Sequence, residues 1–325
     1  MTDRGPQWTR RKILAGLSTA TLALVGCQTQ SEGASPFRLG GTGTGGGTID
    51  VGRIFGGLTS MFSGLSLGEG DEIDMGQKLY PALIARSGGP YRNRRVQTAM
   101  GEIFESRLGA ARERDLPWEI TVVNDSTVNA WALPGGKIAV NKGLLRYVDS
   151  EDELAAVIGH EMGHVELSHA IGEMRTERFA RGFTSIGAEV MSSQLSQGGA
   201  QGMLSGQALQ YLIGPMHEMV TTGYSREAEH EADGHMVKVF RTSGHDPQKG
   251  VAFFRTLLEI IPRDSELTTS LFSTHPGTRA RIDAILAEAQ SQPMAAPRGT
   301  SQAFAVLKES FPTRRVYKRQ ANQGN

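Results

Sequence analysis

The segment from Ser150 to His164 constrains the fold of this chain more than any other part of the sequence. Ser150 and Glu153 form a capping box, which predicts that a helix begins at this point. Apolar residues between 154 and 158 continue the helical pattern. His160 and His164 follow four residues apart, so both imidazoles project from one face of the helix and can reach a single ion.

Residues 160–164 read His-Glu-Met-Gly-His and match the pattern H-E-x-x-H. Glu161 lies about 100° around the helix from His160, which places its carboxylate beside a metal ion rather than on it. A base that acts on metal-bound water occupies this position. The chain has only 8 histidines, so chance would produce the pattern roughly once in a hundred such sequences. We expect one zinc ion per chain with Glu161 as the catalytic base, the alternative being a solvated helix with two incidental histidines.

A catalytic zinc site takes three protein ligands and leaves a fourth position for water, so another ligand must come from elsewhere in the chain. In metzincins this ligand is a histidine six residues after the second motif histidine, and Ala170 occupies that position here. The sequence therefore excludes the metzincin class. His169 is one residue out of register, and we expect it to support a ligand or to pack against the site.

A second segment, residues 225–233, is rich in acidic residues. Glu229 and Asp233 lie four residues apart on an expected helix and so share a face. This spacing lets Glu229 bind the ion while Asp233 accepts the ring N–H of a ligand histidine. Glu227 and Glu231 also share a face, but no acid lies four residues beyond Glu231. Helical spacing thus favours Glu229 and leaves the other two glutamates as alternatives.

The first residues of the chain have the pattern of an export signal. Arg10 and Arg11 precede an apolar run at 13–25 that is too short to span a bilayer comfortably, which is typical of a twin-arginine secretory signal. The run ends before Cys27 in a sequence that resembles the lipobox of bacterial lipoproteins. Cys27 is the only cysteine and cannot form an internal disulfide. We expect a lipid on Cys27, and the alternative is an uncleaved anchor. The residue after Cys27 is Gln28, which favours localisation at the periplasmic side of the outer membrane.

Composition divides the chain into four parts. We expect a signal peptide at 1–26, and a lipidated flexible tether at 27–70 because this stretch contains a long glycine-rich run. A globular domain is expected at 71–290 and a mostly disordered C-terminal extension at 291–325, in which the apolar residues 304–307 are able to dock. Lys+Arg and Asp+Glu both number 34, so no basic field exists that would favour a nucleic-acid partner.

Within the domain the pattern is mostly helical with a small sheet, so we expect an α+β fold. Residues 96–108 have helical apolar spacing, and residues 119–123 read as a strand. Residues 130–133 and 137–140 flank a Pro-Gly-Gly turn and predict a strand pair. We also expect helices at 225–242, from Asp246 to about 261, and from Pro276 onward. Residues 182–223 predict loose helices with a mobile loop. The apolar residues of this segment belong either to the core or to a stripe that contacts lipid; they are Met203, Leu204, Leu209, Leu212 and Ile213.

These segments together resemble a known family. The motif at 160–164 followed by Glu229–Asp233 is similar to the H-E-x-x-H and E-x-x-A-D pair of the CAAX prenyl protease and HtpX family of zinc metalloproteases. No transmembrane segment flanks the motif, so the chain resembles the soluble periplasmic lipoprotein branch rather than the membrane-embedded one. The likeness extends over roughly residues 72–290 and includes Asn129-Ala130, Pro134-Gly135-Gly136 and Thr274-His275-Pro276 with Arg279.

The resemblance implies a gluzincin-type domain with the small sheet beside the H-E-x-x-H helix and Glu229 as the third zinc ligand. It also implies that Asn129 and Ala130 lie in an edge strand that binds an extended peptide, for which the alternative is an ordinary core strand. His275 is a candidate catalytic residue that stabilises the oxyanion. Two other roles are open for His275, namely a fourth zinc ligand that keeps the resting enzyme inactive, or a helix cap.

The function expected from these residues is that of a zinc-dependent endopeptidase. Glu161 would take a proton from water and pass it to the leaving amine. The expected substrates are unfolded or misassembled envelope polypeptides, and envelope assembly machinery is a possible partner. The alternative is a chaperone-like or scaffolding protein in which zinc only stabilises the fold.

Overall fold

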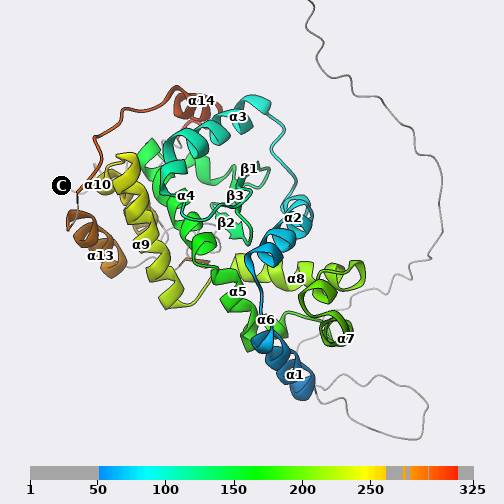
Figure 1. Ribbon diagram of the computed structural model, residues 1–325. Helices are drawn as coiled ribbons and strands as arrows, with labels where there is room; N and C mark the ends of the chain where they lie inside the picture. Colours follow the sequence, from blue (N-terminus) through cyan, green and yellow to red (C-terminus); the bar gives the residue numbers. More distant parts are fainter. Residues whose placement is uncertain (1–50, 261–273, 276–278, 292, 314–325) are drawn as a thin grey trace, which may run out of the picture. The chain divides into compact units, whose positions relative to one another are not determined.

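Figure 1 shows a computed structural model of the chain, which describes residues 51–260, 274–275, 279–291 and 293–313. The predicted signal peptide, Cys27 and Pro276 lie outside the described residues. The helices are α1 (Val51–Gly64), α2 (Glu69–Arg86), α3 (Arg94–Ile103), η1 (Phe104–Leu108), η2 (Gly109–Ala111), η3 (Leu144–Arg146), α4 (Glu151–Glu166), α5 (His169–Met174), α6 (Glu177–Arg181), α7 (Ser185–Met203), α8 (Gly206–Thr222), α9 (Arg226–Ser243), α10 (Pro247–Gly250), α11 (Ala252–Ile260), α13 (Arg279–Gln290) and α14 (Gln302–Ser310).

The described strands form one small sheet. They are β1 (Glu119–Val123), β2 (Ala130–Leu133) and β3 (Lys137–Asn141), in the order β1-β3-β2. β1 runs parallel to β3, and β2 pairs with β3 in the antiparallel direction. Gly135 and Gly136 have positive φ angles of 71° and 82° in the turn between β2 and β3, a conformation that favours glycine. The structure confirms the predicted strand and strand pair, and it leaves β2 at an edge of the sheet.

Both faces of the sheet are buried, and each contributes to a different hydrophobic core. Ala130 and Ala132 of β2 belong to the core that also contains residues of α3, α4 and α14. Trp131 and Leu133, which point the other way, belong to the core formed with α1, α2 and α5 to α8. The sheet and α4 therefore lie in the interior, and Figure 1 shows α4 beside the strands.

α4 begins as predicted. The hydroxyl of Ser150 accepts a hydrogen bond from the backbone N–H of Glu153 at 3.2 Å, and its first turn carries three acidic residues that complement the helix dipole. Every residue from Glu153 to Glu166 is buried. The result is a helix enclosed by protein on all sides, with the sheet on one side and α9 on another.

Part of the segment expected to be a flexible tether forms a helix. Residues 51–64 form α1, in which Leu58 and Phe62 are buried against residues of α6 and α7. The reason lies in the sequence itself, since the glycine-rich run stops at Gly47 and apolar residues with helical spacing follow it. The boundary at residue 70 is therefore wrong.

The C-terminal extension is not simply disordered either. Residues 302–310 form α14, whose Phe304 and Leu307 are buried in the core with α3. The docking expected for residues 304–307 is confirmed.

The segment 182–223 contains the expected helices, α7 and α8, and α7 is kinked at Gly199, which has a positive φ of 52°. Met203, Leu204 and Leu212 are buried, and Leu209 and Ile213 pack against the same core, so the core interpretation of this stripe is confirmed. The helix expected from Asp246 is interrupted at Val251 and forms α10 and α11. Within the described part of the chain, no helix is long and apolar enough to cross a membrane.

Candidate metal centre

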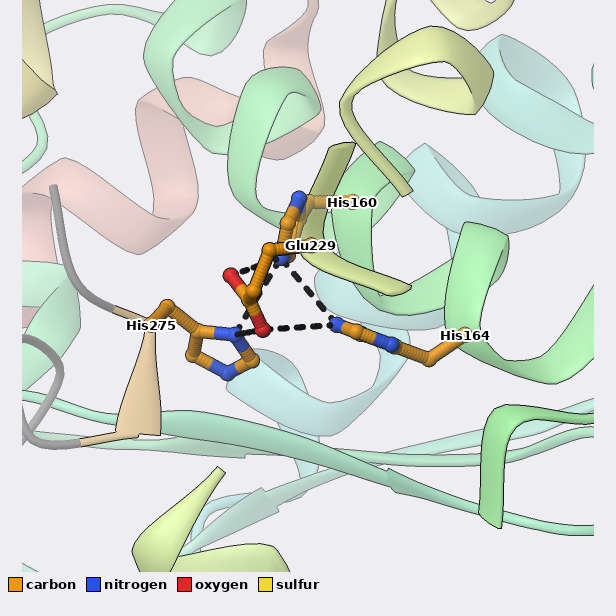
Figure 2. Close-up of side chains that lie close together, drawn as sticks. All are labelled: His160, His164, Glu229 and His275. Atoms are coloured by element: carbon orange, nitrogen blue, oxygen red, sulfur yellow. Dashed lines mark hydrogen bonds and ion pairs between the residues drawn. The ribbon is translucent and has the colours of Figure 1, made fainter. Parts of the chain in front are cut away.

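Four side chains from three separate segments converge at one buried point, shown in Figure 2. Nε2 of His160 lies 3.1 Å from Nε2 of His164 and 3.2 Å from Nδ1 of His275. The carboxylate of Glu229 lies 3.3 Å from His160, 3.5 Å from His164 and 2.9 Å from His275. Ligand atoms about 2.0–2.1 Å from a tetrahedral zinc ion are about 3.3 Å apart, so these four atoms have the spacing of one zinc coordination shell.

Close contact between α4 and α9 brings Glu229 to the two histidines. The contact depends on glycines on the face of α4 that meets α9. A Cβ atom on Gly163 would lie only 2.8 Å from Cα of Ala232, and one on Gly159 would lie 3.0 Å from a methyl group of Val239. The middle of the motif therefore needs a residue without a side chain, because any larger residue would separate Glu229 from the histidines.

Asp233 lies one turn beyond Glu229 on α9, at the other nitrogen of His160. Its Oδ1 is 3.1 Å from Nδ1 of His160, in a contact bent away from ideal hydrogen-bond geometry. The adjacent carboxylate favours a proton on Nδ1, which leaves the lone pair of Nε2 directed into the cluster. Arg281 of α13 forms a bidentate pair with Asp233 at 2.7 Å and reaches Glu229 at 2.9 Å. Sequence reasoning predicted the place of Asp233 and missed Arg281.

The second ring nitrogen of His164 is also held. Its Nδ1 lies 2.8 Å from Nδ1 of His169, and Nε2 of His169 lies 2.9 Å from the carboxylate of Glu231. The ring of His164 stacks on Tyr224, with centroids 4.1 Å apart and planes 20° apart. His169 therefore contacts a histidine of the cluster rather than occupying a place within it.

Glu161 lies beside the cluster and outside it. Its carboxylate oxygen is 3.3 Å from Nε2 of His275, and only 1% of the residue is exposed. Burial opposes ionisation of Glu161, but the nearby His275 outweighs this effect and lowers its pKa. Burial also disfavours the charged form of His275, yet Glu229 and Glu161 raise the pKa of this imidazole to about 10. A carboxylate that remains ionised next to the donor atoms has the charge required of a base.

The charges of this region call for a cation. Glu161, Glu229 and Asp233 carry three negative charges, while Arg281 and the protonated His275 supply two positive charges. A divalent ion bound beside a neutral His275 would replace the imidazolium charge and, with Arg281, would balance all three carboxylates. Burial lowers the pKa of His164 to about 3, so this ring is neutral and presents a bare lone pair to its neighbour. Two facing imidazole lone pairs and a carboxylate form a donor set that fits zinc.

Comparison with known proteins agrees with this geometry. Residues 90–289 match the model of peptidase family M48. The chain belongs to peptidase family M48. This membership confirms the resemblance drawn from the sequence, and with the mostly helical α+β architecture it confirms the gluzincin-type fold.

Similar members of family M48 occur in Escherichia coli strain K12. The beta-barrel assembly-enhancing protease is 30% identical over 240 residues, which are 73% of this chain and 47% of that protein. Metalloprotease YcaL is 32% identical over 170 residues, covering 52% of this chain and 61% of YcaL. Metalloprotease LoiP is 32% identical over 159 residues, covering 49% and 57% respectively. The chain thus spans about half the length of the first of these relatives.

In this M48 chain, the edge strand β2 begins at Ala130, and Asn129 directly precedes it. Ala130 pairs with Val140 of β3, so one side of β2 is used within the sheet. The side-chain oxygen of Asn129 accepts a hydrogen bond from the hydroxyl of Thr274 at 3.3 Å. Asn129 is therefore attached to the segment that carries His275, a contact that sequence reasoning did not foresee. A small hollow where β2 meets the metal centre is lined in part by Ala132, Leu133, His164 and Tyr224.

The arginine that contacts this M48 site differs from the one noted in the sequence. Arg279 is exposed at the first residue of α13, whereas Arg281 is largely buried and pairs with two acids of the site. Both arginines follow His275 closely, so proximity along the chain does not distinguish them. Arg279 and Arg281 are two positions apart on α13, so their side chains point about 200° apart around the helix axis. Only one of the two can therefore face the site.

Proposed function

We propose that this protein is a zinc-dependent endopeptidase. The observation that carries the proposal is the carboxylate of Glu161, ionised and buried beside the four clustered donor atoms of His160, His164, Glu229 and His275. A site that used metal only to stabilise the fold would have no need for such a base. The M48 family membership agrees with this reading.

The residues divide the chemistry among them. His160, His164 and Glu229 would hold the ion, which when bound polarises the scissile carbonyl and lowers the pKa of water from about 15.7 toward 7. Glu161 accepts the proton of the attacking water and transfers it to the leaving amine, which requires no covalent intermediate. Asp233 and Arg281 keep His160 and Glu229 oriented and neutralise part of their charge.

For His275 we propose the role of a fourth ligand in the resting protein. Its Nδ1 lies within the donor set, and its Nε2 lies at the carboxylate of the proposed base. A bound ion would displace the proton that Glu229 and Glu161 otherwise hold on this imidazole, and the freed lone pair would then bind the ion. In this position the imidazole occupies the place that water needs, and it also contacts the group that would activate that water. Substrate turnover then requires that His275 move away from Glu161.

The substrates we propose are unfolded or misassembled polypeptides of the bacterial envelope. An edge strand beside the metal centre favours pairing with the backbone of an extended chain, which tolerates many sequences. One relative, at 30% identity, is named for enhancing β-barrel assembly, which is a property of that protein and supports an envelope substrate here. We also propose that a lipid on Cys27 anchors the chain at the periplasmic side of the outer membrane, and fractionation of a Cys27→Ser variant would test this.

A scaffold with a structural zinc site is the second candidate function, because four ligands would close the coordination shell. Casein degradation separates the two functions when it is measured in the wild type, in Glu161→Gln, and in both forms combined with His275→Ala. We expect Glu161→Gln to lower the rate at least about a hundredfold in either background while each protein retains one zinc ion. If none of the four proteins degraded casein although each bound one zinc ion, the scaffold function would be favoured.

A further inference from the structure

A row of hydrogen-bonding groups leads from the metal centre to the protein surface. Nδ1 of His164 and Nδ1 of His169 are 2.8 Å apart, and Nε2 of His169 is 2.9 Å from Glu231. The side chain of His169 is 8% exposed, whereas that of Glu231 is 63% exposed. The row therefore has a buried inner end and a solvent-exposed outer end.

The protonation pattern along this row follows from its outer end. Glu231 is a carboxylate and can only accept, so Nε2 of His169 carries the proton and donates it. A neutral His169 then has a lone pair on Nδ1 and can only accept there. His164 must accordingly donate through its own Nδ1–H, which leaves the lone pair of its Nε2 free and aimed at the cluster.

The backbone holds His169 in this place by an uncommon conformation. Ser168 has φ 53° and ψ 34°, and it is the one non-glycine residue with positive φ in the described part of the chain. The turn at Ser168 ends α4 and directs α5 back so that its first residue, His169, meets His164. The hydroxyl of Ser168 donates to Glu72 at 2.8 Å and accepts from Arg114 at 2.9 Å, which fixes the turn.

The outer end of the row comes from the helix that also supplies a metal-centre carboxylate. Glu231 follows Glu229 by two residues on α9, and the two side chains point in different directions, one exposed and one buried. A single helix thus presents Glu229 to the ion and Glu231 to His169. Helix α9 therefore positions one ligand, Glu229, and through Glu231 and His169 it also sets the tautomer of another ligand, His164.

We propose that Glu231 and His169 are positioning residues that fix His164 in its metal-binding tautomer. This inference rests on the proposed function, because it assumes that the cluster binds zinc. Neither residue belongs to the cluster of four donor side chains. Their effect is to remove the tautomers in which Nε2 of His164 carries a proton and cannot bind, so their loss weakens zinc binding without altering the set of ligands.

Zinc affinity of the full chain, measured by competition with a colorimetric chelator, tests the proposal. In His169→Leu, which keeps the bulk but no acceptor, we expect the dissociation constant to rise about 10–100-fold. In His169→Asn the amide oxygen takes the approximate place of Nδ1, so affinity should be partly restored. Glu231→Gln should weaken binding by a smaller factor, whereas Glu227→Gln, which removes an exposed charge of the same helix, should not change it.

A role in packing alone predicts the opposite order, since leucine fills the buried site better than asparagine does. The proposal is overturned if His169→Asn binds zinc no better than His169→Leu, or if Glu231→Gln and Glu227→Gln bind zinc equally well. Because Glu231 is exposed, Glu231→Gln should fold normally, and its zinc affinity tests the proposal even if substitutions at His169 prevent folding. Failure of the wild type itself to bind zinc would instead refute the proposed function.

Discussion

At the scale of single residues, the position of His275 has the largest consequence for activity. Both of its ring nitrogens are engaged, one with the donor cluster and the other with Glu161. We expect His275→Ala to retain one zinc ion, because His160, His164 and Glu229 remain. Casein degradation should rise by roughly tenfold or more, since opening of the fourth position no longer requires movement of the imidazole.

The control for this prediction is Glu161→Gln in the same background, which should abolish the added activity. If His275→Ala abolished proteolysis while binding zinc normally, His275 would be an oxyanion-stabilising residue and the resting-state interpretation would be wrong. Unchanged proteolysis would leave it a structural residue only.

Sequence alone predicted part of this site and missed the rest for a definite reason. The pair His160 and His164, with Glu161 between them, follows from helical spacing within one segment. Asp233 follows in the same way once Glu229 is chosen. By contrast, Arg281 and the contact between Asn129 and Thr274 join segments far apart in the chain, and no local period encodes such contacts.

At the scale of elements, the close packing of α4 and α9 determines whether the site forms. Alanine at position 163 would favour the helix by about 1 kcal/mol on intrinsic propensity. Its Cβ would however lie 2.8 Å from the backbone of Ala232, and overpacking of this kind costs about 1–3 kcal/mol. We expect Gly163→Ala to lower both the free energy of unfolding and the affinity for zinc, because α9 must move away.

Gly101→Ala in α3 is the matched control, since no atom lies within 4 Å of its added Cβ and only the propensity gain applies. Urea denaturation of both variants, combined with zinc titration, measures the two effects. Greater stability of both variants with unchanged zinc affinity would contradict the packing argument.

Element boundaries were least predictable where composition changes gradually. α1 was not predicted because the glycines at 56 and 57 make its composition similar to that of the preceding glycine-rich run. The helix is nevertheless buried through Leu58 and Phe62, which have helical spacing. α14 was expected only as a docking segment, because a nine-residue helix is not stable by itself and depends on the core that receives it.

At the scale of the whole molecule, α14 connects residues 302–310 to the start of the helix that carries the metal motif. Lys308 of α14 donates to the carbonyl of Val148 at 2.7 Å, and its charge lies near Glu153 in the first turn of α4. Burial raises the pKa of Glu153 to about 7. The folded protein therefore retains a proton that an unfolded glutamate releases near pH 4.3.

The sign of the resulting pH dependence follows from that proton. The stability contributed by neutral Glu153 is complete below about pH 4.3 and is lost as the pH rises through about 7. Glu153→Gln stays neutral throughout. We expect the variant to equal the wild type near pH 4 and to exceed it at pH 8 by on the order of 1 kcal/mol, or about 2–4 °C in Tm, after a discount for solvent screening.

Thermal unfolding followed by circular dichroism across this pH range, at one fixed zinc concentration, tests the prediction. A variant less stable than the wild type at pH 8 would show that Glu153 contributes as a charged partner of Lys308 instead.

The arrangement of cores was the least accessible feature of the whole molecule. The strand positions were predicted correctly, but no prediction was made of which sheet faces are buried. A short strand such as Ala130–Leu133 contains no polar residue that would mark an exposed face. Once both faces are covered, β2 offers only its unpaired edge.

The central claim is that one divalent ion lies between two imidazoles of α4 and a carboxylate of α9. Anomalous diffraction at the zinc absorption edge, from crystals grown with zinc, tests it most directly. The account predicts a single strong peak about 2.0–2.2 Å from Nε2 of His160, Nε2 of His164 and the carboxylate of Glu229. A peak elsewhere in the molecule, or no peak at this cluster, would contradict it.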